Sequence, residues 1–197
     1  MSKYFNVAGP CNPKDHYMLP AASRCPSLDP LIEKGQYFIV YGARQTGKTT
    51  FLQDIAKKLT AGGKHIGLYC SLETVQGFNE PVEGAKAIIN AMRKSIEFHP
   101  ALFGLTFAGK RDLANVSTVL QMALTDLCLA REKPLVILFD EVDCLSGETK
   151  ITFLRQLRDG FINRASIPFA HSIGLAGMRN VRDYQAKVPP EDLPPDS

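Results

Sequence analysis

The 197-residue sequence has little of what marks membrane, nucleic-acid-binding or disulfide-rich proteins. It contains no tryptophan, and its net charge of +3 is too small to indicate nucleic acid as a partner. The longest strongly apolar run, Leu135 to Phe139, is far shorter than the ~20 residues that a transmembrane helix needs. The composition therefore indicates a globular chain without a membrane partner.

The five cysteines form no C-x-x-C pair and no cluster with histidine at the spacing of a zinc site. Cys70 and Cys128 lie in apolar surroundings, where a cysteine usually serves as a small core residue. The stretch from Met1 to Asn6 has no apolar segment of the kind found in secretory signals. We therefore expect reduced structural thiols and a cytoplasmic location.

Apolar runs alternate with amphipathic stretches along most of the chain. Expected strands cover residues 36–41, 65–70, 135–139 and 172–176. Expected helices cover residues 48–60, 80–98, 118–131 and a stretch that begins near 148. This alternation predicts an α/β fold, a parallel sheet with helices on both faces. The first strand is almost entirely apolar, which is typical of a strand covered on both faces.

Proline divides the chain into three parts. Residues 1–35 contain five prolines and are expected to form an irregular arm, whose apolar side chains, such as Tyr4, Phe5 and Tyr17, pack on the core. Residues 36–186 form the core. Residues 187–197 are acidic and proline-rich and are expected to be disordered.

Two local signals concern the ends of helices. Thr118 and Gln121 have the spacing of a capping box, which predicts that the third helix begins there. Asp159 and Gly160 leave open whether the fourth helix bends or ends at that point.

The segment from Gly42 to Thr49 matches the phosphate-loop pattern G-x-x-x-x-G-K-[ST] at every required position. Its glycines let the backbone curl so that successive N–H groups converge, next to the positive end of the following helix. We expect Lys48 to contact the β- and γ-phosphates of a nucleotide and the Thr49 hydroxyl to bind Mg²⁺. The candidate nucleotide-binding residues are Gly42, Ala43, Arg44, Gln45, Thr46, Gly47, Lys48, Thr49 and Thr50.

Two carboxylates, Asp140 and Glu141, directly follow the apolar run 135–139. At the end of a strand an aspartate can orient Mg²⁺, and a following glutamate can polarise an attacking water. We therefore assign Asp140 to the metal together with Thr49, and Glu141 to catalysis together with Lys48. The alternative is a solvated strand end without function.

Two further strands end in polar residues. Arg179 follows the last strand and suits the anionic charge that develops during phosphoryl transfer, which makes it a third catalytic candidate. The alternative is a surface arginine in a loop. Ser71 ends the second strand, where its hydroxyl could hydrogen-bond Glu141 and hold it away from the water.

Three segments together resemble the ATP-binding core of the AAA-like ATPases: Gly42 to Thr50, Phe139 to Asp143 and Gly177 to Arg182. More narrowly, the chain looks like a prokaryotic branch near the signal-transducing ATPases with numerous domains. The resemblance covers roughly residues 4–185. It implies ATP and Mg²⁺ as cofactors and a three-layer P-loop NTPase core, with the strand that ends at Gly177 between the other two motif strands. It also implies that the arm, around residues 17–20, lies near the adenine.

The chain departs from that family after Asn180, where no run has the pattern of the usual fifth strand or helical lid. The phosphate-loop strand would then be an open sheet edge, which a second copy or another protein would cover. Two functions remain open, a slow ATPase that acts as a signalling switch and a non-catalytic module that binds nucleotide and associates in response. A small-molecule kinase is disfavoured, because no acceptor pocket or lid is recognisable.

Overall fold

The structure, a computed structural model, describes residues 3–7, 9, 11–18, 21–109 and 111–177. One parallel sheet has the strand order β1 (Phe38–Tyr41), β4 (Ser172–Gly177), β3 (Leu135–Asp140) and β2 (Ile66–Ser71). The expected parallel α/β sheet is confirmed, and so is the position of β4 between the two motif strands. Within the described residues the sheet has no fifth strand, and residues 178–197, with the expected disordered tail, lie outside them.

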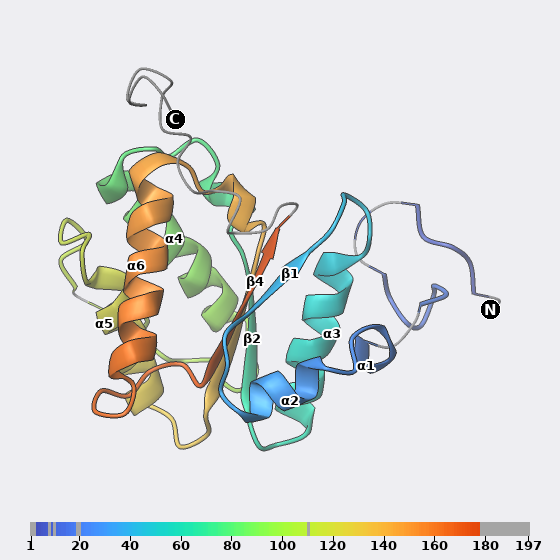
Figure 1. The fold of residues 1–197 in the computed structure, drawn as a ribbon. Coiled ribbons are helices and arrows are strands. Elements are labelled where there is room, and N and C mark those ends of the chain that lie inside the picture. Colours follow the sequence, from blue (N-terminus) through green and yellow to red (C-terminus); the bar gives the residue numbers. More distant parts are fainter. Residues whose placement is uncertain (1–2, 8, 10, 19–20, 110, 178–197) are drawn as a thin grey trace, which may run out of the picture.

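Helices form a layer on each side of the sheet (Figure 1). On one side lies α3 (Lys48–Ala61), beside the short helices α1 (Ala21–Arg24) and α2 (Leu28–Glu33). On the other side lie α4 (Pro81–Glu97), α5 (Val119–Leu129) and α6 (Gly147–Asn163). No helix in the described part of the chain combines the length and hydropathy required to span a bilayer.

Strand β3 is buried along its whole length and belongs to two hydrophobic cores. Ile137 and Phe139 pack into the core formed with α4, α5 and α6, whereas Val136 and Leu138 face α3. This division follows from the alternation of side chains along a strand. Cys70 lies in the first of these cores, as expected, and burial raises the pKa of its thiol to about 12.

The expectation that β1 is covered on both faces is wrong. In the described structure β1 pairs with β4 alone, and its residues Ile39 and Tyr41 are 38% and 62% exposed. Phe38 and Val40 pack towards α3, whereas Tyr37, just before the strand, packs against the core on the opposite face. An apolar run does not distinguish a central strand from an edge strand, because that difference depends on which neighbours the fold supplies.

The capping box predicted at Thr118 and Gln121 is not formed. Helix α5 has no side-chain cap from Thr118 in the described structure. Its first N–H groups are instead satisfied by Gln156 of α6, whose Oε1 accepts from Leu120 at 2.8 Å and from Gln121 at 3.2 Å. The side chain of Gln121 is used elsewhere and donates to Asp159. A cap supplied from another helix leaves no local sequence signal.

Helix α6 continues past Asp159 and Gly160 to Asn163, so the helix does not end at the glycine. The glycine has a packing role, because a Cβ there would lie 2.3 Å from the ring of Phe169. Gly160 therefore lets the segment that leads into β4 approach the helix.

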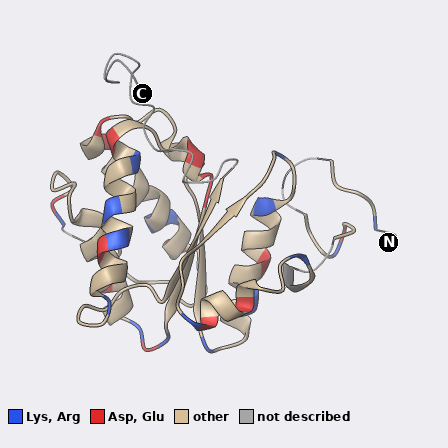
Figure 2. Ribbon diagram, viewed as in Figure 1, with Lys and Arg blue, Asp and Glu red and all other residues tan. Residues whose placement is uncertain are grey.

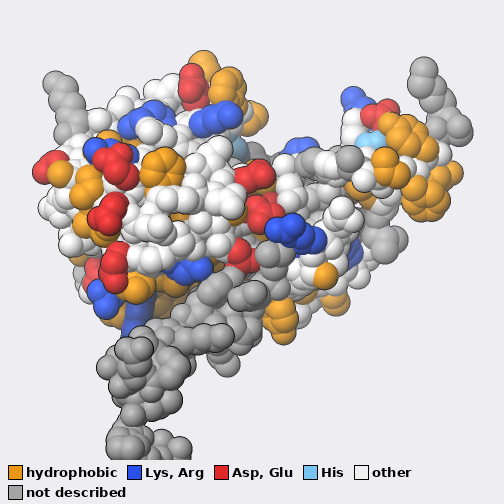
Figure 3. Space-filling model, turned by 90° about the horizontal axis from the view of Figure 1, so that it is seen from above, with side chains coloured by type: hydrophobic (Ala, Val, Ile, Leu, Met, Phe, Trp, Pro, Cys, Tyr) orange, Lys and Arg blue, Asp and Glu red, His pale blue; other side chains and the backbone are white. Residues whose placement is uncertain are grey.

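The arm has an attached part and an exposed part. Leu28 and Ile32 of α2 are buried in the core formed with α3. Nearer the N-terminus, Tyr4 and Tyr17 are joined by a backbone hydrogen bond, and the rings of Phe5 and Tyr17 lie 5.1 Å apart. These three aromatic residues are more than half exposed. They were expected to pack on the core, but they contact one another instead. Figure 3 shows hydrophobic side chains gathered on the projecting part of the arm.

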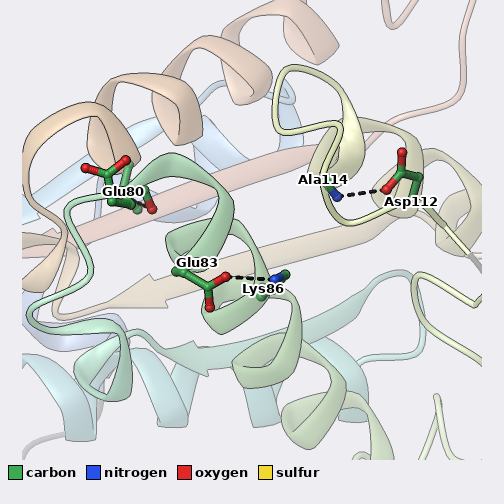
Figure 4. A network of polar contacts seen from close by, with 6 residues as sticks. Glu80, Glu83, Lys86, Asp112 and Ala114 are labelled. Carbon is green, nitrogen blue, oxygen red and sulfur yellow. Dashed lines mark hydrogen bonds and ion pairs between the residues drawn. The ribbon is translucent and has the colours of Figure 1, made fainter.

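Charged residues are scattered over the helices. Figure 2 shows both signs along α3 and α6, as the small net charge suggests. The outer face near α4 carries exposed local contacts, such as the Glu83–Lys86 ion pair at 2.7 Å and a turn in which Asp112 accepts from the amide of Ala114 (Figure 4). Exposed pairs of this kind contribute only ~0.2–1 kcal/mol. These exposed contacts are therefore minor, and the charged residues that bear on chemistry lie at the ends of the strands.

Candidate functional site

A cleft of about 1250 Å³ lies at the carboxyl ends of the strands, the usual place for ligands in open parallel sheets. The phosphate loop lines one side, and the acidic segments around Glu73 and Glu141 line the other. Seen from above, acidic and basic side chains approach one another there (Figure 3). The volume is sufficient for a nucleoside triphosphate.

The phosphate loop connects β1 to α3 through two left-handed residues. Gln45 has φ 60° and Gly47 has φ 78°, and the Thr46 hydroxyl closes the turn by donating to the carbonyl of Ala43 at 2.9 Å. Backbone that alternates in this way collects N–H groups in one concavity, which is a preferred site for anions. The loop thus has the shape that its sequence pattern predicts.

Lys48 stands at the first position of α3, beside the concavity. Its ammonium donates to the carbonyls of Gly42 and Ala43, each at 2.9 Å. Both acceptors are neutral, whereas a phosphate oxygen carries a negative charge and would pair with the ammonium as a counter-ion as well as through a hydrogen bond. An anion in the cleft would therefore compete well for this ammonium.

Asp140 is the most constrained acid of the site, with 1% of its surface exposed. Its Oδ2 accepts from the Thr49 hydroxyl at 2.6 Å and from the Tyr69 hydroxyl at 3.0 Å, and its Oδ1 accepts from the amide of Glu141 at 3.0 Å. The structure therefore brings together the two residues that the sequence assigned to the metal. Burial and the adjacent carboxylate raise the pKa of Tyr69, which keeps its phenol protonated as a donor.

Tyr69 was not identified from the sequence. It lies in β2, two residues before Ser71, which pairs with Asp140 in the register between β2 and β3. Alternation along the strand places Tyr69 on the same face as Asp140. The only available signal was a residue with a polar tip in an otherwise apolar strand.

Glu141 has the left-handed backbone conformation, with φ 55° and ψ 41°, and lines the cleft. Such a conformation is strained for a residue other than glycine and is often found at functional sites. Burial raises the pKa of Glu141 above its usual range, the charge of Asp140 raises it further, and Lys48 opposes the shift. The contact suggested between Glu141 and Ser71 is not what the structure shows, since the Ser71 hydroxyl accepts from the amide of Glu73 at 3.3 Å.

Comparison with protein families decides the classification. Residues 32–184 match the family model described as AAA domain. The chain belongs to the AAA domain family. This agrees with the resemblance found in the sequence and with the P-loop core seen in the structure. A search of curated proteins gave no significant match.

Solved structures similar to this AAA domain include a DNA replication initiation factor, with 17% identity and a TM-score of 0.45 over 84% of this chain and 40% of that chain. Another is a structure of Drosophila ORC bound to poly(dA/dT) DNA and Cdc6, with 10% identity and a TM-score of 0.51 over 83% of this chain and 25% of that chain. The AAA domain spans less than half the length of either. At these identities the likeness concerns the fold alone.

Two contacts from the arm to the phosphate loop of the AAA domain had no sequence signal. The amide of Cys11 donates to the hydroxyl of Thr50 at 3.0 Å, and Arg24 donates to two carbonyls of the loop. The described residues of the arm that line the cleft are Asn6, Val7, Gly9 and Cys11. Residues 19 and 20 lie outside the described residues, so the expectation that the stretch 17–20 lies near the adenine stays a prediction. Arg179 lies outside the described residues, so its assignment stays a prediction.

Proposed function

We propose that this AAA domain binds ATP with Mg²⁺ in the cleft and hydrolyses it slowly. The observation that carries the proposal is the contact between Thr49 and Asp140, because it joins the phosphate loop to the acidic strand at one point. Hydroxyl and carboxylate oxygens are suitable ligands for Mg²⁺, which usually binds to few protein groups and completes its shell with water and phosphate. Within the described residues, no group of three or more His, Cys, Asp or Glu side chains converges.

The loop residues would bind the triphosphate. The N–H groups of the loop would face its oxygens, and Lys48 would exchange its carbonyl acceptors for phosphate oxygens. Thr49 and Asp140 would hold the metal, which when bound neutralises charge on the phosphates. Binding would therefore replace the two contacts from the Lys48 ammonium to the carbonyls of Gly42 and Ala43.

Glu141 would act as the general base. Its carboxylate would accept a proton from the water that attacks the γ-phosphorus, which releases ADP and phosphate. A raised pKa suits this task, because a base is most effective when its pKa approaches the working pH. Arg179 remains the candidate that would stabilise the developing negative charge.

A second candidate function is a non-catalytic module that binds nucleotide and associates with a partner in response. The observation that favours it is the edge strand β1, with Ile39 and Tyr41 exposed beside its unpaired backbone groups in the described structure. Such an edge invites pairing with another chain. A second copy or a different protein would cover it, and either function is compatible with a signalling switch.

Phosphate release by the wild type and by Glu141→Gln tests the catalytic proposal. Gln keeps the size of the side chain but cannot accept the proton, so we expect a rate lower by about 10²-fold or more. Calorimetric titration with Mg-ATP, with Lys48→Ala as the non-binding control, tests nucleotide binding. ATP binding with equal background rates in both proteins would leave the non-catalytic module, whereas a folded wild type that binds no nucleotide would refute both functions.

A further inference from the structure

One contact between the arm and the phosphate loop is made by Arg24, the last residue of α1. Its Nη2 donates to the carbonyl of Thr46 at 2.7 Å, and its Nη1 donates to the carbonyl of Gly47 at 3.1 Å. The guanidinium also lies over the ring of Phe51 in α3, 5.4 Å from the ring centroid. A planar guanidinium can bridge two adjacent carbonyls in this way, whereas an ammonium is a single point of charge.

This contact affects the opposite side of the loop. In a trans peptide the C=O and the N–H of one unit point in opposite directions, and the described chain contains no cis peptide bond. The carbonyl of Thr46 shares its peptide unit with the N–H of Gly47, and the carbonyl of Gly47 shares its unit with the N–H of Lys48. With both carbonyls bound by Arg24, these two N–H groups point away from the guanidinium, which leaves them available to a phosphate.

The conformation of the phosphate loop is strained, so a contact that holds its carbonyls would stabilise it. Gln45 and Gly47 are both left-handed, a backbone conformation that is strained for a residue other than glycine, such as Gln45. The Gly47 carbonyl is already the acceptor for the amide of Phe51, and it uses its second lone pair for Arg24. A Cβ on Gly47 would lie 3.2 Å from the Nη1 of Arg24, a tight contact that a small shift of this exposed side chain would relieve, so it is the left-handed backbone that favours glycine here.

We propose that Arg24 is a positioning residue of the nucleotide site, which orients the peptide groups of the phosphate loop from the N-terminal arm. The proposal rests on the proposed function and extends it, because it makes the arm part of the site. Arg24 is exposed, so its replacement opens no cavity in the core. Its effect should be on ligand affinity and not on folding.

The experiment compares two ligands on the full chain by calorimetry, Mg-ATP and magnesium tripolyphosphate, which has the phosphates but no base. We expect Arg24→Gln to weaken the binding of both ligands by the same factor, about tenfold, because the loop amides are no longer pre-oriented. Arg24→Lys should lose nearly as much, since its charge remains but the bridge does not. The matched control is Lys58→Gln, which removes one positive charge from an exposed ion pair with Asp29 and should change neither affinity by more than about twofold.

Three results would overturn the role of Arg24. Wild-type affinity in Arg24→Gln would show that the bridge is irrelevant, and wild-type affinity in Arg24→Lys would show that only charge matters. A loss for Mg-ATP without a loss for tripolyphosphate would mean that the arm acts through the base. The midpoint temperature of thermal unfolding, measured without ligand for the wild type and each variant, verifies folding. All titrations are made below the lowest of these temperatures. A folded wild type that binds neither ligand would refute the proposed function itself, and this proposal with it.

Discussion

The Thr49 hydroxyl lies 2.6 Å from Oδ2 of Asp140, although 91 positions separate the two residues in the sequence. Thr49 belongs to the first turn of α3, whereas Asp140 ends β3, and the insertion of β4 between β1 and β3 sets the distance between them. Because the strands are parallel, their carboxyl ends share one edge of the sheet. The topology thus brings a hydroxyl and a carboxylate together without any local signal for the pairing.

Replacement of Asp140 by Asn should remove most of the benefit that Mg²⁺ gives to ATP binding. The amide is nearly the same size but uncharged, so it is a poor partner for a hard cation. In titrations with Mg²⁺ and with EDTA, we expect the wild type to bind ATP more tightly with the metal. In the variant, the ratio of the ATP affinity with Mg²⁺ to the ATP affinity with EDTA should be smaller by about tenfold or more, while the affinity measured with EDTA stays unchanged. Asp112→Asn, far from the cleft, is the control, and an equal gain from Mg²⁺ in all three proteins would contradict the assignment.

The parts of this site that the sequence predicts are those built by consecutive residues. The phosphate loop has its shape because Gly47 and its neighbours carry the required backbone freedom and the strand and helix around it are locally encoded. Strand β3 was predictable as a strand because a short unbroken apolar run with polar residues at both ends is typical of one. Asp140 then followed as the first polar residue after that run. The same pattern did not reveal that β3 is central and β1 is at the edge.

The parts that the sequence did not predict depend on contacts between distant segments. Tyr69 reaches Asp140 only through the register of β2 on β3, and Arg24 reaches the loop only because α1 packs beside α3. The edge position of β1 was expected, because no run after Asn180 has the pattern of a fifth strand, and the described structure agrees. The exposure of Ile39 and Tyr41 was not expected, because the apolar residues of β1 are the same whether or not a neighbour covers them. Secondary-structure propensity and residue spacing describe a single segment, whereas the contacts of Tyr69 and Arg24 and the exposure of β1 depend on how two segments pack together.

Two tyrosines offer a matched test of the polar network around Asp140. The Tyr69 hydroxyl donates to a buried carboxylate, whereas the buried Tyr37 hydroxyl has no hydrogen-bond partner in the described structure. We therefore expect Tyr69→Phe to lower the free energy of unfolding by about 1–2 kcal/mol. Tyr37→Phe should leave it unchanged or raise it by up to ~1 kcal/mol, because it removes an unsatisfied group. Urea denaturation measures both, and equal losses would show that the Asp140 contact has no special value.

Stability should fall as the pH is lowered, and His65 should account for part of the fall. Burial lowers the pKa of His65 below its ordinary value of 6.5, and His171, with its ring 5.1 Å away, lowers it further. The unfolded chain therefore takes up a proton near pH 6.5, whereas the folded chain resists it. The contribution is present above pH 6.5 and is lost as the pH falls from there towards the lower pKa of the folded state. His65→Gln should show a shallower fall in urea midpoint between about pH 7.5 and 5.5, and an unchanged slope would contradict this origin.

The cap of α5 gives the sharpest comparison between a local prediction and a tertiary contact. Gln156 accepts two helix N–H groups and donates to the carbonyl of Val116 at 2.8 Å, whereas Thr118 makes no side-chain cap in the described structure. Gln156→Leu keeps the apolar bulk but leaves those backbone groups unsatisfied in a buried position, so unfolding should become easier by about 2–3 kcal/mol. Thr118→Ala should change the free energy of unfolding by less than ~0.5 kcal/mol. Chemical denaturation of the two variants decides the matter, because a larger loss for Thr118→Ala would mean that the helix relies on the local cap after all.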